Sequence, residues 1–250
     1  MNQFDSLHDL PLYNGPEPLQ HSHEMSEPRK FVIGDIHSHF DEMMDLFKRV
    51  GFIFEKDLLI SLGDLVDRGP KPIEVIEKLM EVKNFIHILG NHDEWCYQYL
   101  KSNRIPKEWK SQGGKHTLEE YQKAPHLWEK HIRFFENAKL FFIDPESRLF
   151  VHGGYNPRIP FYRQQEDKDI LLWDRSLVLT ALEYHQIDRV FEEFREIFIG
   201  HTPTLFIGDS APKHFANLWM LDTGVHISGK LTLMDLDTKE YWQSEIVNDT

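Results

Sequence analysis

The same arrangement occurs at five places along the chain: a short apolar run, usually a glycine, and then a side chain that can bind a metal ion. The five segments are Phe31–His37, Leu62–Asp64, Leu89–His92, Val151–Gly154 and Ile199–His201. Together they offer carboxylate, imidazole and amide groups, a mixture that holds divalent ions such as manganese, iron or zinc. No set of thiolates accompanies them to favour a closed structural zinc site. The residue types therefore indicate a catalytic metal site.

The spacing of the acidic residues suggests that two ions are bound. Asp35 and His37 stand two positions apart, so both side chains can reach one ion from the end of the same strand. An aspartate placed between two ions can bridge them, and Asp64 is the candidate for that position. Two ions about 3.5 to 4 Å apart activate a hydroxide and neutralise phosphoryl oxygens. The pattern thus favours hydrolysis of a phosphoester.

An alternation of strands and helices must position these side chains. Apolar runs predict strands at 31–34, 58–63, 85–90, 149–151 and 197–200. Amphipathic stretches predict helices at about 40–50, 71–82, 92–101, 117–135 and 176–194. Further strand-like runs predict a closing antiparallel meander at 219–222, 230–237 and 240–243. This order is typical of a layered α/β fold, in which ligands bind where the strands end.

Length and composition predict one catalytic domain preceded by an extension. The chain has 250 residues, of which 40% are hydrophobic, enough for one sizeable core. Residues 1–28 are rich in proline, histidine and acidic residues without a sustained period, which predicts a flexible N-terminal extension and leaves 29–250 as the catalytic domain. His21 and His23 in that extension could bind a metal weakly, but we interpret them as solvated.

Charge and cysteine content narrow the class of protein. The formal charge of −13 argues against stable binding of nucleic acid, so an anionic substrate must meet a local positive site made by cations and arginines. The lone Cys96 excludes an internal disulfide and is predicted to be buried and inert. Neither a secretion signal nor an apolar run of about 18–20 residues is present, which predicts a cytoplasmic protein without membrane contact. The oligomeric state stays open.

The motifs as a set resemble the phosphoprotein phosphatase family of calcineurin-like metallophosphoesterases. The likeness is closest to small bacterial and phage serine/threonine protein phosphatases and to diadenosine tetraphosphatase-like enzymes, and it covers about residues 30–240. The matching motifs are Gly34-Asp35-Ile36-His37, Gly63-Asp64-Leu65-Val66-Asp67-Arg68-Gly69, Gly90-Asn91-His92-Asp93, His152-Gly153-Gly154 and Gly200-His201. The resemblance implies a layered α-β-β-α sandwich with mixed sheets and a helical cap insert.

The resemblance also implies metal ligands at matching positions. Asp35 and His37 would bind the first ion and Asp64 would bridge. The second ion would be bound by Asn91, His152 and His201. A metal-bridging hydroxide would attack phosphorus directly, without a covalent phosphoenzyme. Manganese is the predicted metal, with iron or zinc as alternatives.

The resemblance further implies His92 as the general acid, oriented by Asp67. Chemistry agrees, because an alkoxide leaving at neutral pH needs a proton donor, and imidazole beside a carboxylate is suited to that task. Arg68 and Arg175 are the predicted phosphate clamps, because guanidinium groups fit phosphoryl oxygens. The Gly113–Gly114 segment is predicted to shape the helical cap.

Two substrate classes remain open at this point. The intact set of Asp64, Asp67 and Arg68 favours a phosphoserine or phosphothreonine phosphatase. Small size, the helical insert and Asp93, where protein phosphatases commonly have glutamate, favour the alternative, a hydrolase of dinucleoside polyphosphates or nucleotides. A nuclease or cyclic phosphodiesterase is disfavoured because Thr202-Pro203 follows His201 and the second histidine of Gly-His-x-His is missing.

Several other histidines lie near the motifs without an assigned role. His39 and His226 could line the pocket, although a satisfied or solvated histidine is an equally good interpretation. His87 is predicted to be structural, as are His126 and His131.

Overall fold

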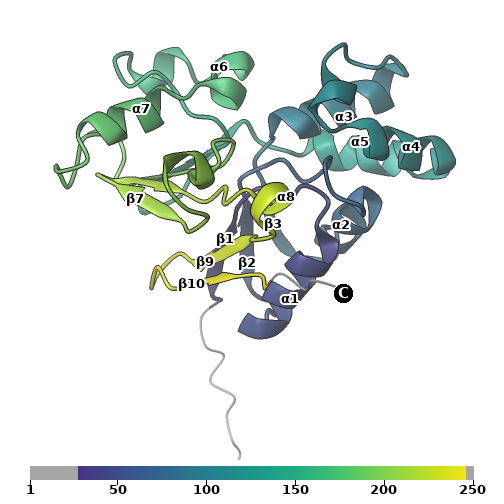
Figure 1. Ribbon diagram of the computed structural model, residues 1–250, viewed down its shortest axis with the longest axis horizontal. Coiled ribbons are helices and arrows are strands. Elements are labelled where there is room, and N and C mark those ends of the chain that lie inside the picture. Colours follow the sequence, from purple (N-terminus) through teal and green to yellow (C-terminus); the bar gives the residue numbers. More distant parts are fainter. Residues whose placement is uncertain (1–27, 246–250) are drawn as a thin grey trace, which may run out of the picture.

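The computed structural model describes residues 28–245. The extension predicted at residues 1–28 therefore lies outside the described residues apart from Pro28, and so do His21 and His23. The described chain forms two five-stranded sheets with helices gathered in two groups (Figure 1). This arrangement confirms the predicted layered α/β fold with mixed sheets.

The first sheet has the strand order β10-β9-β1-β2-β3. Its strands are β1 (Lys30–Ile33), β2 (Leu58–Ser61), β3 (Asn84–His87), β9 (Thr232–Asp235) and β10 (Tyr241–Gln243). β1, β2 and β3 are parallel, so their carboxyl ends lie at one edge, whereas β9 pairs antiparallel with both β1 and β10. The loops that follow β1, β2 and β3 carry three of the five predicted ligand segments.

The second sheet has the order β4-β5-β6-β8-β7. Its strands are β4 (Phe141–Ile143), β5 (Arg148–Val151), β6 (Glu196–Ile199), β7 (Lys213–Phe215) and β8 (Leu218–Met220). β5, β6 and β8 are parallel, and the antiparallel strands β4 and β7 form the edges. The remaining two ligand segments follow β5 and β6.

An apolar core holds the two sheets face to face. Side chains alternate along each strand, so Val32 points into the core between the sheets, while Phe31 and Ile33 pack against helices on the outer face. Phe150 and Phe198 of the second sheet stack with ring centroids 5.0 Å apart in the same inter-sheet core. Burial of each such side chain contributes about 1.5–3 kcal/mol. The inter-sheet core therefore fixes the relative position of the two sets of ligand loops.

The helices cover the outer faces. One group packs on the first sheet: α1 (Phe40–Val50), α2 (Pro72–Leu79), α3 (Asn91–Ser102), α4 (Lys115–Lys123) and α5 (Trp128–Glu136). The second group packs on the second sheet: α6 (Lys168–Trp173) and α7 (Ser176–Glu183). A short helix, α8 (Val225–Ser228), leads from β8 back to the first sheet. Short 3₁₀ turns occupy Trp109–Gln112, Pro125–Leu127, Phe161–Arg163 and Thr204–Ile207.

Three sequence expectations about the elements were wrong. The helix predicted at 117–135 is divided into α4 and α5, because Pro125 lacks the N–H that would continue α4. The helix predicted at 176–194 ends at Glu183. The predicted meander is divided between sheets, since β8 runs parallel to β6 and only β9 and β10 close the first sheet. The strands β4 and β7 and the helices α6 and α8 were missed.

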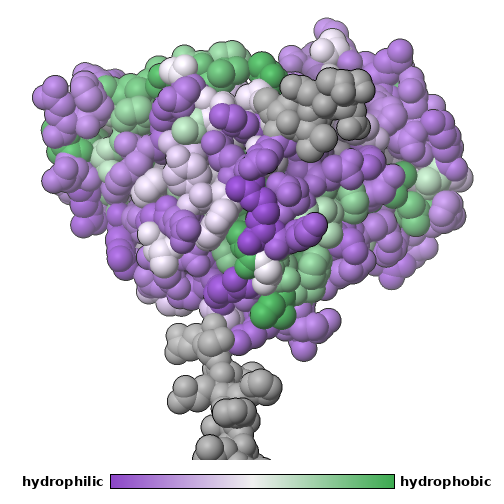
Figure 2. Space-filling model, turned by 60° about the horizontal axis from the view of Figure 1, so that its bottom comes forward, coloured by the Kyte–Doolittle hydropathy of each residue, from purple (hydrophilic) through white to green (hydrophobic). Residues whose placement is uncertain are grey.

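The surface agrees with the acidic, charged composition. On the face drawn in Figure 2, hydrophilic residues predominate and apolar residues occupy smaller patches. Charged residues make up 28% of the sequence, and the formal charge is −13. Any positive site for an anionic substrate must therefore be local.

Candidate metal centre and active site

The loops after the parallel strands of both sheets meet around one cavity of about 160 Å³. Eight of the ten predicted site residues line it: Asp35, His37, Asp64, Arg68, Asn91, His92, Arg175 and His201. The other two, Asp67 and His152, are buried behind the wall and contact lining residues through hydrogen bonds. The structure thus brings all ten predicted residues together.

Asp64 lies at the centre of the arrangement. Its Oδ2 is 3.7 Å from His37 Nε2, and its Oδ1 is 3.4 Å from His152 Nε2. Two groups of possible ligand atoms, each within 4.8 Å, share Asp64: one with His37 and His92, the other with His152 and His201. A ligand common to two ions has to lie in such a position.

Unsatisfied atoms in the cavity test whether these residues fit a cation. Asp35 Oδ1 and His201 Nε2 are buried without a hydrogen-bond partner among the described residues. An unpaired buried polar group costs about 1–3 kcal/mol, and a divalent cation would supply the missing partner. Asn91 Oδ1 and His152 Nε2 also face one another at 2.9 Å. The donor set and its unsatisfied atoms fit a divalent metal.

Backbone contacts orient the imidazoles. His37 Nδ1 lies 3.0 Å from the carbonyl oxygen of Val66, and His152 Nδ1 lies 2.7 Å from that of Leu62. With Nδ1–H donating to a carbonyl, Nε2 of His37 is turned toward Asp64, and Nε2 of His152 toward Asp64 and Asn91. Such outer hydrogen bonds set the tautomer and the ring orientation of metal-binding histidines.

Glycines let the loops approach each other closely. A Cβ atom on Gly90 would lie 2.1 Å from Asp64 Oδ1, and one on Gly200 would lie 2.2 Å from Asp35 Oδ1. These two positions therefore require glycine. In contrast, five non-glycine residues at the site have positive φ, between 45° and 73°: His37, Asp64, Asp67, Arg68 and His201. Strain of this kind gathers at functional sites, where the surrounding structure enforces it.

Charges within the cavity perturb the titratable groups strongly. Burial opposes the charge of Asp64, but the imidazoles of His152, His92 and His37 outweigh it and hold the pKa of Asp64 well below its usual value. Burial also opposes the charge of His152, yet Asp64 raises the pKa of His152 to about 10. Burial, with the charge of His152, lowers the pKa of His201 to about 2, so that ring is neutral and able to bind a cation.

Asp67, itself held by Trp109, fixes His92 at the cavity. His92 Nδ1–H donates to Asp67 Oδ2 at 2.7 Å, and the same oxygen accepts the indole N–H of Trp109 at 2.7 Å. His92 Nε2 accepts from Arg68 Nη2 at 3.1 Å and lines the cavity. Gly114 makes room for Trp109, because a Cβ there would lie 2.3 Å from the indole ring. The Gly113–Gly114 segment thus lies where the predicted cap meets Asp67 and Arg68.

Residues from the second sheet and its helices form the mouth. Arg175 is exposed there, Trp173 is partly exposed, and Phe206 has 74% of its surface exposed. His226 also lines the cavity, and burial together with the charge of Arg68 lowers the pKa of His226 to about 4. The sequence analysis assigned no role to Trp109, Trp173 or Phe206. Only their neighbours, Gly113–Gly114 for Trp109 and Arg175 for Trp173, could have pointed to the two tryptophans.

Two remaining expectations can be compared with the structure. His39 Nδ1 lies 2.7 Å from the carbonyl oxygen of His37, and His39 is not among the residues lining the cavity. Cys96 is completely buried, and burial raises the pKa of its thiol well above the usual value. An inert, buried thiol is what the sequence predicted.

The fold and the cluster of aspartate and histidine side chains define a metal-dependent hydrolase, and comparison with known proteins agrees. Residues 29–227 match the family model described as calcineurin-like phosphoesterase, so the chain belongs to that family. It is a metal-dependent phosphoester hydrolase.

Two relatives of this chain are named for different activities. The chain is 26% identical to the asymmetrical bis(5′-nucleosyl)-tetraphosphatase PrpE of Anoxybacillus flavithermus, across 81% of this chain and 88% of that protein. It is 27% identical to serine/threonine-protein phosphatase 2 of Salmonella typhimurium, across 82% and 92%. In structure it resembles a protein serine/threonine phosphatase from Saccharomyces cerevisiae, with a TM-score of 0.61, 17% identity and coverage of 91% and 83%. Among residues 28–245, no helix has the length and apolar character to span a bilayer.

Proposed function

We propose that this hydrolase is a phosphomonoesterase of the serine/threonine protein phosphatase type. The observation that carries the proposal is the 2.7 Å hydrogen bond between His92 and Asp67, with Arg68 beside the same imidazole. This arrangement suits expulsion of a poor leaving group such as the alkoxide of serine or threonine. The cavity of about 160 Å³ has room for one phosphoryl group and the ions that bind it, so the rest of the substrate stays outside.

In this proposal two divalent ions are held by the loops of both sheets. Asp35 and His37 would hold one ion, and Asp64 would be a ligand of both. Asn91, His152 and His201 would hold the second ion. When bound, the ions supply Lewis-acid neutralisation of phosphoryl charge and a nucleophilic water at neutral pH.

The chain itself supplies the proton for the leaving oxygen. Asp67 accepts Nδ1–H of His92 and so fixes the orientation of the ring, while Nε2 faces the cavity. Nε2 accepts a hydrogen bond from Arg68 Nη2. We propose that Arg68 turns to the phosphoryl oxygens when substrate enters, which frees Nε2 to carry the proton. Arg175, which lies between α6 and α7, approaches the same phosphoryl oxygens from the side of the second sheet.

The identity of the metal, the substrate partner, the location in the cell and the absence of stable nucleic-acid binding stay predictions. Manganese is the proposed metal, with iron or zinc as alternatives, because the mixed oxygen and nitrogen donors suit all three. The proposed partner is a phosphorylated protein, and the proposed location is the cytoplasm. The acidic surface supports the prediction that nucleic acid is not bound stably.

A dinucleoside polyphosphate is the second candidate substrate. It is supported by the exposed aromatic faces of Phe206 and Trp173 at the mouth, since nucleobases stack on such faces. The similarity to the bis(5′-nucleosyl)-tetraphosphatase supports it too.

A substrate panel in saturating manganese tests the proposal. The substrates are a phosphoserine peptide, diadenosine tetraphosphate and a bis-ester, and the products are identified by mass spectrometry. We expect phosphate release from the peptide and its loss in the His92→Asn variant. Cleavage of diadenosine tetraphosphate with the peptide left intact would establish the second candidate instead.

A further inference from the structure

Behind the metal-binding loops lie two buried side chains that the proposed mechanism does not use. His87 is the last residue of β3 and Asp93 belongs to the first turn of α3. His87 Nε2 and Asp93 Oδ2 are 3.0 Å apart, and the side chains are 4% and 0% exposed. Burying such a pair is costly unless its polar atoms are well used.

Asp93 connects two ligand loops through their backbones. Its Oδ1 accepts the N–H of Leu65 at 2.8 Å, and its Oδ2 accepts the N–H of Gly90 at 3.1 Å. Leu65 directly follows Asp64, and Gly90 directly precedes Asn91. One carboxylate therefore joins the loop after β2 to the loop after β3, beside a proposed ligand in each.

Helix capping accounts for only part of this arrangement. Asp93 occupies the third position of α3, so its acceptance of the Gly90 N–H is one half of a capping box, the half that a glycine N-cap allows. The bond to Leu65 reaches a loop 28 residues away and has no part in capping. A cap also does not need the imidazole of His87.

The geometry around Asp64 leaves little freedom in the spacing of these loops. Asp64 has a φ of 50°, and its Oδ1 accepts the N–H of His92 at 2.9 Å. Gly90 lies so close that an added Cβ would clash with Asp64 at 2.1 Å. A shift of about 1 Å in groups that hold ions or substrate can cost about a hundredfold in rate.

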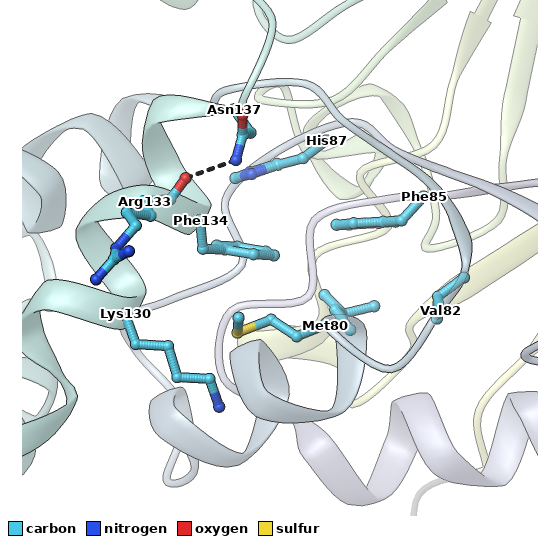
Figure 3. A pocket seen from close by; sticks show the side chains of 9 residues that line it. Met80, Val82, Phe85, His87, Lys130, Arg133, Phe134 and Asn137 are labelled. Atoms are coloured by element: carbon cyan, nitrogen blue, oxygen red, sulfur yellow. Dashed lines mark hydrogen bonds between the residues drawn. The ribbon is translucent and has the colours of Figure 1, made fainter.

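Aromatic contacts hold His87 in the orientation that this pairing needs. Its ring stacks with Phe134 at 5.2 Å and with Phe85 at 6.0 Å. Figure 3 shows the three rings in the wall of a groove between α2, β3 and α5. His87 Nδ1 has no partner among the described residues, which leaves Nε2–H as the donor to the carboxylate.

We infer that His87 and Asp93 are positioning residues that set the separation of the loops bearing Asp64 and Asn91, and thereby the affinity for metal. The inference rests on the proposed ligand roles of Asp64 and Asn91. Asp93 holds both loops, and His87 keeps the carboxylate turned toward them.

Direct metal titration tests this inference without any substrate. His87→Phe retains an aromatic ring against Phe85 and Phe134 but removes the donor, and Asp93→Asn leaves one acceptor where there were two. Manganese binding is measured by isothermal titration calorimetry and by equilibrium dialysis. We expect both variants to bind manganese about 10- to 100-fold more weakly, as when an outer-shell partner of a metal site is lost. Saturating manganese should restore kcat to within a few-fold of the unchanged enzyme.

A control separates positioning from loss of stability. Asn217 is buried in the turn between β7 and β8 and hydrogen-bonds the backbone of Phe191 and Phe194, so Asn217→Asp disturbs a comparable network in the other sheet, away from these loops. It should lower the melting temperature without changing the metal affinity.

Unchanged manganese affinity in folded His87→Phe would overturn the inference, and so would equal weakening in Asn217→Asp. If Asp93→Asn does not fold, Asp93→Glu and His87→Phe decide. Failure of the unchanged enzyme to hydrolyse a phosphopeptide would refute the proposed substrate, yet the metal titrations would still test the positioning pair.

Discussion

The two halves of the molecule contribute to the site in different ways. In the first half, β1–β3 and α1–α5, the proposed metal ligands and the His92–Asp67 pair are buried, and only the phosphate clamp Arg68 is exposed. Asp67 is completely buried and contacts both His92 and Trp109. In the second half, β4–β8 and α6–α8, the residues at the mouth are open to solvent, and within residues 28–245 no hydrogen bond or ion pair holds the guanidinium of Arg175.

This difference suggests that the first half carries out the reaction and that the mouth of the second half recognises the substrate. A proton donor works only in a narrow geometry, so a rigid, buried setting favours catalysis. Exposed side chains there are free to adjust to the substrate: Arg175 can turn to the phosphoryl oxygens, and Phe206 can contact the group attached to them. Changes in the first half should therefore act mainly on kcat, and changes at the mouth of the second half mainly on KM.

The largest effect should come from Asp64, which lies between the halves. Asp64→Asn weakens the proposed shared ligand, and we expect metal content to fall and kcat/KM to drop on the order of 10⁴-fold, because the ions supply several kcal/mol of charge stabilisation. Metal content is measured by elemental analysis of dialysed protein. Asp57→Asn is the matched control, since Asp57 is a buried aspartate paired with Arg29 away from the site. Normal metal content in Asp64→Asn would refute the shared role.

His92→Asn should be next in size and should separate leaving groups. We expect kcat for an alkyl phosphate to fall about 10³-fold, while 4-nitrophenyl phosphate, whose leaving group needs little protonation, loses much less. Both ions should stay bound. His131→Asn serves as the control, because His131 of α5 is a buried histidine bonded to Tyr121 of α4 and Glu77 of α2. Equal losses for both substrates would contradict the general-acid role.

Arg175→Ala tests the solvent-exposed mouth of the second half. We expect kcat/KM to fall about 10- to 100-fold, mostly through KM, since a hydrogen bond to a charged group contributes about 1.5–3 kcal/mol. Steady-state kinetics on a phosphopeptide measures the change. Arg158→Ala removes another exposed arginine of the same half and should leave both constants unchanged. A loss confined to kcat would break the proposed division between the halves.

Trp109→Phe should have the smallest effect. It tests whether the hydrogen bond from Trp109 to Asp67 contributes to catalysis in the first half. The change removes one of the donors to Asp67 Oδ2, and about 1 kcal/mol for that bond predicts a roughly fivefold lower kcat on an alkyl phosphate with KM unchanged. Trp128→Phe is a close control, because the Trp128 indole donates to the Tyr121 carbonyl instead. If both variants lowered kcat equally, the Trp109 bond would have no specific part.

Much of the site could be read from short sequence segments. Each predicted ligand directly follows an apolar strand, often through glycine, and this pattern depends only on neighbours in the chain. The helix at 40–50 agrees with the structure at both ends. The helix predicted at 176–194 failed because periodicity alone does not show where packing support stops.

The sequence by itself determined the chemistry available, namely which carboxylates, imidazoles and guanidinium groups stand at strand ends, because residue type and local periodicity carry that information. Tertiary structure alone decided that β8 joins the second sheet, that Trp109 supports Asp67 from 42 positions away, and that Asp93 joins two loops. These contacts depend on how two sheets and their helices pack around a shared core, and a pattern of neighbouring residues does not specify partners so distant in the chain.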